Sequence, residues 1–158
     1  MGAVRIVIVG GSFGGLTAAY ELRRHLSPER AEITLLAKDD QFRFVPSYPW
    51  VAMGRRRLEQ ISFPLAGTLA RKQVRFANET VTHIDTAAKV VATDAGEHPY
   101  DFLVIATGHR SANEAVPGLG AFDGSGHSPM SAPETEELAQ SIGRLLAEPG
   151  PVVIGAAP

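Results

Sequence analysis

Val9-Gly10-Gly11-Ser12-Phe13-Gly14-Gly15 is the stretch that decides the fold of this 158-residue chain. The residues that lead into it, 4–9, are nearly continuous in valine and isoleucine, which is typical of a parallel strand buried on both faces. After it, apolar residues recur at helical spacing until Ser27 and Pro28, which end the helix. A glycine-rich turn between a strand and a helix is the setting in which such loops bind dinucleotides. The sequence therefore predicts a strand, a phosphate-binding turn and a helix.

The small residues of this turn have separate expected roles. Gly10 would permit the tight turn, and Gly14 or Gly15 would let the helix pack closely on the strand. The amides at the start of the helix would then face a pyrophosphate. Ser12 stands where the usual G-x-G-x-x-G pattern has its second glycine, and it is small enough for a diphosphate to approach the backbone. We expect nucleotide binding, with a purely structural turn as the alternative.

The ribose partner is less well defined. An acidic residue is expected at the end of the second strand, about 20 residues further on, where it would accept hydrogen bonds from ribose hydroxyls. Ala37 and Lys38 occupy this position, and Asp39 and Asp40 come slightly later. Either carboxylate could reach in from the loop, backbone atoms could serve instead, or both acids could belong to a solvated turn. The sequence leaves these three possibilities open.

The rest of the chain is predicted to continue the α/β pattern. Buried strands are expected at residues 32–37, 102–106 and 151–154, and a helix at residues 133–147. Short antiparallel strands are expected at residues 74–76, 80–84 and 89–93. Residues 39–64, rich in proline and aromatic residues, indicate an ordered excursion more than a regular element, and residues 116–129 are rich in glycine and proline.

Composition excludes several kinds of protein. With 44% hydrophobic and 20% charged residues, the chain is expected to fold into a compact domain. A formal net charge of -2 provides no basic surface for a phosphate backbone, so no nucleic acid partner is expected. The absence of cysteine excludes disulfides and a cysteine nucleophile within these residues, and the five histidines lack ligand spacing, so no metal site is predicted. No apolar run approaches the roughly 20 residues that span a bilayer, and a cytoplasmic location is expected.

The last ten residues repeat the opening pattern. Residues 149–158 contain a second predicted strand that runs into a turn started by a glycine, and the sequence then stops. A strand without its following helix cannot close a second dinucleotide-binding unit. We therefore expect residues 1–148 to form a partial nucleotide-binding domain, and residues 149–158 to be the truncated first strand of another.

Four segments together resemble the amino-terminal part of sulfide:quinone oxidoreductases, which are relatives of flavocytochrome c sulfide dehydrogenase and of type II NADH dehydrogenases. The segments are residues 9–15, 44–50, 104–108 and 149–156. The resemblance covers essentially the whole chain in order. It implies a three-layer FAD/NAD(P)-binding Rossmann-like fold of the α/β class, with a parallel sheet, a small antiparallel meander and a crossover helix.

The resemblance also implies roles for individual residues toward FAD. The pyrophosphate would be cradled by Gly10, Gly11, Ser12, Phe13, Gly14 and Gly15. Ala37 and Lys38 would lie beside the adenosine ribose, and the backbone of Thr80 and Val81 would meet the adenine. Pro46 and Ser47 would line the flavin ring region, and Ala106, Thr107 and Gly108 would pass close to the cofactor. No catalytic residue is expected within the chain.

The implied activity is oxidation of sulfide to zero-valent sulfur, with electrons passed through FAD to quinone. One redox cysteine of some family members falls at Met130, so the cysteine chemistry would come from residues beyond Pro158. The first alternative is a type II NADH dehydrogenase-like flavoprotein on the same scaffold. The second is an inert nucleotide-binding fragment, because this superfamily completes the FAD domain with later segments. The 158 residues alone are then expected to bind FAD weakly and not to oxidise sulfide.

Two further expectations concern partners. Family resemblance implies a homo-oligomer with sulfide and quinone as small-molecule substrates. Arg55, Arg56 and Arg57 form a short basic run that would allow peripheral association of the full-length protein with the inner membrane, although three charges are normally a solvated turn. His109, which follows Gly108 directly, is expected to be a surface loop residue.

Overall fold

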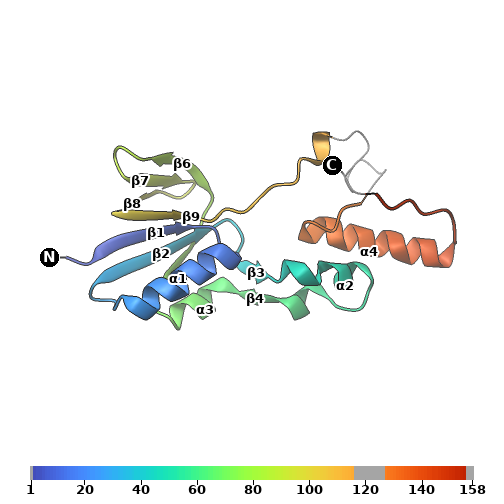
Figure 1. Ribbon diagram of the computed structural model, residues 1–158, viewed down its shortest axis with the longest axis horizontal. Helices are drawn as coiled ribbons and strands as arrows, with labels where there is room; N and C mark the ends of the chain where they lie inside the picture. The colour runs from blue at the N-terminus through green and yellow to red at the C-terminus, as the bar shows by residue number, and fades with distance from the viewer. Residues whose placement is uncertain (1, 116–126, 156–158) are drawn as a thin grey trace. The chain divides into compact units, whose positions relative to one another are not determined.

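The computed structural model of the chain describes residues 2–115 and 127–155 (Figure 1). They fall into two compact units, which are described separately. The first comprises Met1–Arg43 and Ser62–Arg110, and the second comprises Phe44–Ile61 and Ser111–Pro158, each as far as the structure describes it. The predicted boundary between residues 148 and 149 stays a prediction.

A parallel sheet forms the centre of the first unit. Its strands lie in the order β5 (Arg75–Asn78), β2 (Ala31–Ala37), β1 (Val4–Val9) and β9 (Phe102–Ile105), and all neighbouring pairs are parallel. The predicted strands at the positions of β1, β2 and β9 are confirmed, although β9 ends one residue earlier than expected. In β1 and β2, residues 6–9 and 33–36 are buried, and because side chains alternate along a strand, these residues are buried on both faces of the sheet.

Two layers cover the sheet, one on each face (Figure 1). Helices α1 (Phe13–His25) and α3 (Leu65–Ala70) pack on one face, where side chains of β1 and β2 join those of both helices in a buried cluster: Ile6, Ile8, Leu16, Ala19, Ile33, Leu35, Leu65 and Leu69. A second buried cluster lies between the other face and the antiparallel strands: Val7, Val9, Leu36, Val91 and Tyr100. The predicted three-layer α/β fold is confirmed.

The antiparallel layer is a meander of β6 (Val81–Asp85), β7 (Val90–Thr93) and β8 (Glu97–Pro99). The strands predicted at residues 80–84 and 89–93 are confirmed as β6 and β7. The sequence analysis missed β8, which has only three residues and contains a proline. A proline is tolerated there because β8 is an edge strand of this sheet.

The prediction for residues 74–76 was wrong in one respect. The strand β5 lies there, but it pairs with β2 in parallel instead of joining the antiparallel meander. The reason is the short helix α3, which precedes β5 and provides a crossover from the β2 side of the sheet. A strand reached through a helix returns in the same direction, and a strand reached through a tight turn reverses.

Residues 39–64 were expected to lack regular elements, and this expectation was also wrong. In the first unit, β3 (Gln41–Arg43) pairs with β4 (Ser62–Pro64) in antiparallel fashion. The rings of Phe42 and Phe63 stack across this pair with their centroids 4.7 Å apart. Aromatic stacking between facing strands stabilises a pair that is too short to be recognised from its alternation pattern.

The second unit is built around two helices, α2 (Tyr48–Ala52) and α4 (Ala132–Ala147), with 3-10 turns at Val45–Ser47, Leu58–Ile61 and Asn113–Ala115. The predicted helix at residues 133–147 is confirmed. Ser131 is the N-cap residue of α4: its hydroxyl accepts from the Glu134 amide (3.4 Å) and donates to the Glu134 carboxylate (2.7 Å). Glu134 is buried and also accepts from the Asn113 amide group, so it acts through hydrogen bonds as well as through the helix dipole.

The strand predicted at residues 151–154 is absent from the described residues. Residues 151–155 form no regular element, and Val153 and Ile154 are 95% and 93% exposed. A parallel strand needs a neighbour to supply its hydrogen bonds, and this segment pairs with none of the described strands. Residues 116–126 of the glycine- and proline-rich stretch, and residues 156–158 of the expected turn, lie outside the described residues. Met130, at the position of a redox cysteine of some family members, is 46% exposed.

Candidate functional site

The parallel strands bring most of the predicted nucleotide-binding residues to one edge of the sheet. Because β1, β2, β5 and β9 run in the same direction, the segments that follow them leave from the same edge. These segments hold Gly10 to Gly15 after β1, Ala37 and Lys38 at the end of β2, Thr80 and Val81 beyond β5, and Ala106 to Gly108 after β9. The chain passes from β1 to β2 on one side and to β9 on the other, and such a switch point is where open α/β sheets bind ligands.

Gly10 lies where the ends of β1, β2 and β9 meet. Its φ of 117° is a conformation that side chains with a Cβ rarely adopt, and a Cβ placed on it would lie 2.2 Å from the Ala106 carbonyl oxygen. The Gly10 amide donates to the Leu36 carbonyl at 2.8 Å, and the Ala106 amide donates to the Val9 carbonyl at 2.8 Å. The ends of β1, β2 and β9 are therefore tied together around a residue that only glycine suits.

Gly15 sets how closely the helix approaches the strand. A Cβ on Gly15 would lie 1.8 Å from the Gly10 carbonyl oxygen, and one on Gly14 would lie 3.3 Å from the Ala106 Cβ. On the other side of the loop, a Cβ on Gly11 would lie 2.9 Å from the Ala37 Cβ. Gly15 therefore lets α1 pack closely on β1, as predicted. A Cβ has no room at Gly15 without a backbone shift, whereas at Gly14 a small shift of Ala106 would admit one.

The start of α1 fits a diphosphate. Ser12 is the N-cap residue, it is exposed, and its carbonyl accepts the first helical bond from Leu16 at 3.0 Å. Its hydroxyl makes no capping bond, so the small side chain leaves the approach to the backbone open. The amides of a first helical turn have no acceptor within the helix, and the helix dipole favours an anion there. Phe13 directs its ring toward β3, where it meets Phe42 edge-on at 5.1 Å.

The surroundings of Asp39, Asp40 and the end of β2 bear on which group could contact the ribose. Asp39 forms an ion pair with Arg43 and accepts from the Gln41 amide at 3.2 Å, so its carboxylate already has partners within β3. Lys38 and Asp40 are exposed. The Ala37 carbonyl accepts from the Asn78 side chain (3.0 Å) and from the Glu79 amide (3.1 Å), which ties the end of β2 to the corner after β5.

The corner after β5 is tied internally as well. The Thr80 amide donates to the Asp94 carboxylate at 2.9 Å, and the Asp94 amide donates to the Thr80 carbonyl at 3.0 Å. The Thr80 amide therefore has a partner inside the protein, and one lone pair of its carbonyl is engaged. The backbone of Thr80 could therefore contact an adenine only through the second lone pair of its carbonyl. The predicted adenine contact now depends more on Val81.

The remaining predicted residues are only partly placed. Thr107, Gly108 and His109 are exposed beyond β9, and Gly108 has a φ of 72°. Pro46 and Ser47 belong to the second unit, in the 3-10 turn Val45–Ser47, where Pro46 is exposed and Ser47 is buried. The flavin-lining role of Pro46 and Ser47 stays a prediction.

A partly buried polar group beside the corner after β5 was not predicted from the sequence. The Glu79 side chain is 20% exposed, and its carboxylate lies 2.7 Å from His98 Nε2 and 2.7 Å from the Thr93 hydroxyl. These hydrogen bonds lower the pKa of Glu79 below its ordinary value of 4.5, with the Thr93 bond the largest cause, because both favour the charged carboxylate. No local pattern signals this group, since its members are 14 and 19 residues apart in the sequence.

The lowered pKa predicts how acid acts on the wild-type protein and on Glu79→Gln. A carboxylate with a lower pKa in the folded state stabilises the fold above its unfolded pKa, and the gain is lost as pH falls through the folded value. The advantage of wild type over Glu79→Gln is therefore expected to be complete at neutral pH and to shrink below about pH 4.5. Urea midpoints of the full polypeptide between pH 7 and pH 3 measure it. An advantage that stays constant over this range would contradict the assignment.

A cavity of about 630 Å³ lies elsewhere in the first unit. It is lined by the amino-terminal halves of β1 and β2 and by β8, and its charged residues include Arg5, Glu32, Arg75 and Glu97. None of the predicted nucleotide-binding residues lines it. We place the candidate site at the glycine loop and not in this cavity, because backbone amides and a close-packed turn are what a diphosphate needs.

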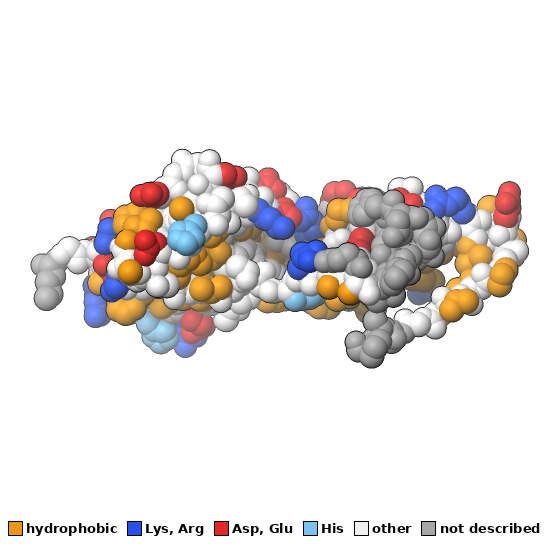
Figure 2. All heavy atoms as spheres, turned by 90° about the horizontal axis from the view of Figure 1, so that it is seen from above, with side chains coloured by type: hydrophobic (Ala, Val, Ile, Leu, Met, Phe, Trp, Pro, Cys, Tyr) orange, Lys and Arg blue, Asp and Glu red, His pale blue; other side chains and the backbone are white. Residues whose placement is uncertain are grey.

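The described residues contain no cluster of three or more histidine or carboxylate side chains suited to a metal ion. Within the same ranges, no helix is long and apolar enough to cross a membrane. On the face shown in Figure 2, basic and acidic side chains are interspersed instead of forming a continuous stretch of one charge.

Comparison with known proteins identifies the relatives of this chain. A sulfide-quinone reductase from Aquifex aeolicus (strain VF5) is 40% identical over 157 residues, which cover 99% of this chain and 35% of that protein. The crystal structure of the sulfide:quinone oxidoreductase from Aquifex aeolicus matches with a TM-score of 0.84 at 36% identity, over 93% of this chain and 33% of that one. The resemblance inferred from the sequence is confirmed.

A second group of relatives is more distant. A type II NADH:quinone oxidoreductase from Staphylococcus haemolyticus (strain JCSC1435) is 30% identical over 115 residues, which cover 73% of this chain and 29% of that protein. The chain thus spans about a third of the length of these relatives. The family model for pyridine nucleotide-disulphide oxidoreductases matches residues 4–158. With its glycine loop at the switch point of a parallel sheet, the chain belongs to the pyridine nucleotide-disulphide oxidoreductase family.

Proposed function

We propose that this chain is the FAD-binding portion of a sulfide:quinone oxidoreductase. The observation that carries the proposal is the glycine loop, where Gly10 and Gly15 approach backbone carbonyls so closely that only glycine fits, at the edge where α1 begins. The fit to FAD rests on this cradle and on the amides of the first helical turn. Greater similarity to the Aquifex sulfide-quinone reductase than to the staphylococcal NADH:quinone oxidoreductase favours sulfide as the electron donor.

In the proposed reaction, hydrosulfide loses two electrons and its proton to give zero-valent sulfur. Quinone gains the two electrons and two protons, one of them from the solvent in net terms, to give quinol. When bound, FAD would supply the two-electron redox chemistry between them. The residues described here would position FAD. The loop from Gly10 to Gly15 would hold the pyrophosphate, and Ala106 would close the turn beneath it. These 158 residues contain no cysteine, so none of them would supply a thiol to the reaction.

Anaerobic flavin spectroscopy of the full polypeptide that contains these residues tests the proposal. We expect a yellow protein with about one flavin per chain, whose visible absorbance is bleached by sulfide and restored by a short-chain quinone. Free FAD with the same sulfide concentration is the control for direct reduction. Bleaching by NADH and not by sulfide would support the NADH dehydrogenase-like alternative. A protein that binds no flavin would overturn both.

A further inference from the structure

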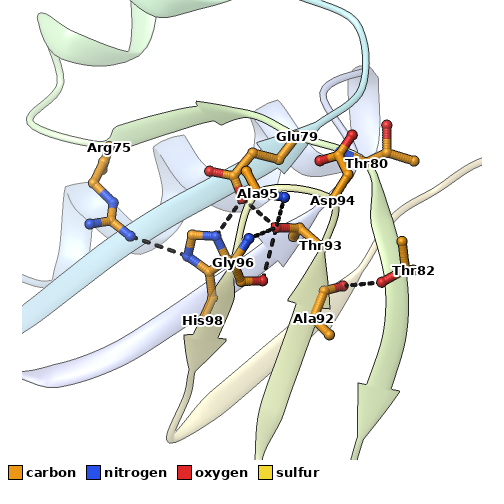
Figure 3. Close-up of polar contacts among 10 residues, drawn as sticks. All are labelled: Arg75, Glu79, Thr80, Thr82, Ala92, Thr93, Asp94, Ala95, Gly96 and His98. Carbon is orange, nitrogen blue, oxygen red and sulfur yellow. Dashed lines mark hydrogen bonds and ion pairs between the residues drawn. The ribbon is translucent and has the colours of Figure 1, made fainter.

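A four-residue cluster joins the parallel sheet of the first unit to its meander (Figure 3). We call Arg75, Glu79, Thr93 and His98 the Glu79 cluster. Arg75 lies in β5, Glu79 follows β5, and Thr93 and His98 lie in β7 and β8. Figure 3 shows the side chains of Thr93 and His98 directed toward the Glu79 carboxylate, with Arg75 on the far side of the imidazole.

Each hydrogen bond within the cluster has an assignable donor and acceptor. Arg75 Nη2 lies 3.2 Å from His98 Nδ1, and a guanidinium can only donate, so Nδ1 is the acceptor and Nε2 carries the proton of the neutral ring. His98 Nε2 then donates to Glu79 Oε2, and the Thr93 hydroxyl donates to the same oxygen. The His98 side chain is only 10% exposed, so the loss of its acceptor would leave a buried donor without a partner.

Glu79 also lies in the corner between β5 and β6, and its backbone helps to hold that corner in place. Its amide donates to the Ala37 carbonyl, and Ala37 Cβ borders Gly11 of the glycine loop. The next residue, Thr80, donates its amide to the Asp94 carboxylate and accepts from the Asp94 amide with its carbonyl. The carboxylate of Glu79 therefore holds the meander against the corner, while its amide holds the corner against the end of β2.

We propose that Glu79 is a positioning residue for the adenosine half of FAD. The proposal rests on the proposed function, because it needs FAD at this edge of the sheet. Held by Thr93 and His98, Glu79 fixes the place of Ala37 and Val81 on either side of the expected adenosine site. A binding surface whose supporting residues are locked keeps its geometry without an ordering cost at each binding event.

The test compares FAD with FMN, which lacks the adenosine half, in the apoprotein of the full polypeptide. Glu79→Ala is expected to weaken FAD binding about tenfold, the effect of losing one to two hydrogen bonds of ordinary strength, and to leave FMN binding unchanged. Glu79→Gln, whose amide oxygen can still accept both bonds, is expected to retain most of the FAD affinity. Glu97→Ala is the matched control, because Glu97 is an exposed glutamate of the adjacent β8. Dissociation constants come from flavin fluorescence titration.

Each outcome of this experiment is decisive. Equal losses for FAD and FMN would mean a general structural role and would overturn the proposal, as would no loss for either. If Glu79→Ala does not fold, Glu79→Asp, with a carboxylate one methylene shorter, is judged by the same ratio of the two affinities. Wild-type protein that binds no FAD would refute the proposed function itself, a result distinct from failure of the Glu79 assignment.

Discussion

Replacing Gly15 by alanine is expected to reduce the affinity of the full polypeptide for FAD at least on the order of a hundredfold, equivalent to about 3 kcal/mol. The added Cβ would lie 1.8 Å from the Gly10 carbonyl oxygen. That atom belongs to the backbone, so no side-chain rotation can relieve the overlap. Either α1 moves away from β1 or the turn at Gly10 rearranges, and both changes displace the amides that would meet the pyrophosphate.

Gly67→Ala is the matched control for this prediction. Gly67 is a glycine of α3 in the same unit, and a Cβ added to it meets nothing within 4 Å. Alanine there is expected to stabilise the helix by about 0.5 to 1 kcal/mol and to leave FAD affinity unchanged. Isothermal titration of apoprotein with FAD and thermal unfolding measure the two effects. FAD affinity of Gly15→Ala within threefold of wild type would show that the loop is not the diphosphate site.

The features that could be predicted from the sequence are those with local causes. The strand at Val4–Val9, the glycine turn and the helix after it each follow from consecutive residues, and they place the candidate site. The meander strands β6 and β7 follow from alternation and from the turn between them. The start of α4 also has a local cause, since Ser131 and Glu134 lie three residues apart at its first turn.

The features that could not be predicted depend on distant residues. The direction of β5 is set by a crossover through α3 and by pairing with β2, so its own residues carry no signal of it. The Glu79 cluster joins residues of β5, β7 and β8 that meet only after the sheet and the meander have packed. The strand predicted at residues 151–154 is absent although its local pattern favours one, because none of the described strands pairs with it.

The second large effect is expected in the core, from alanine at two consecutive residues of β2. Leu35 and Leu36 are both fully buried, and their side chains point to opposite faces of the sheet. Leu35 packs in the cluster with α1 and α3, and Leu36 packs in the cluster beneath the meander. Leu35→Ala and Leu36→Ala are each expected to cost about 3 kcal/mol, through lost apolar burial and the cavity left behind. Glu32→Ala is the control, because Glu32 is an exposed residue of the same strand and alanine there should change stability by less than about 0.5 kcal/mol.

Native-state hydrogen exchange of the β1 and β2 amides measures these effects within the first unit, whatever the stability of the rest of the polypeptide. A loss of about 3 kcal/mol corresponds to exchange that is faster on the order of a hundredfold. In a three-layer fold both substitutions must destabilise the protein. Leu35→Ala leaves a cavity between the sheet and the helices, and Leu36→Ala leaves one between the sheet and the meander. If Leu36→Ala alone were mild, the meander would not be packed on the sheet, and Thr93 and His98 could not hold Glu79 at the corner.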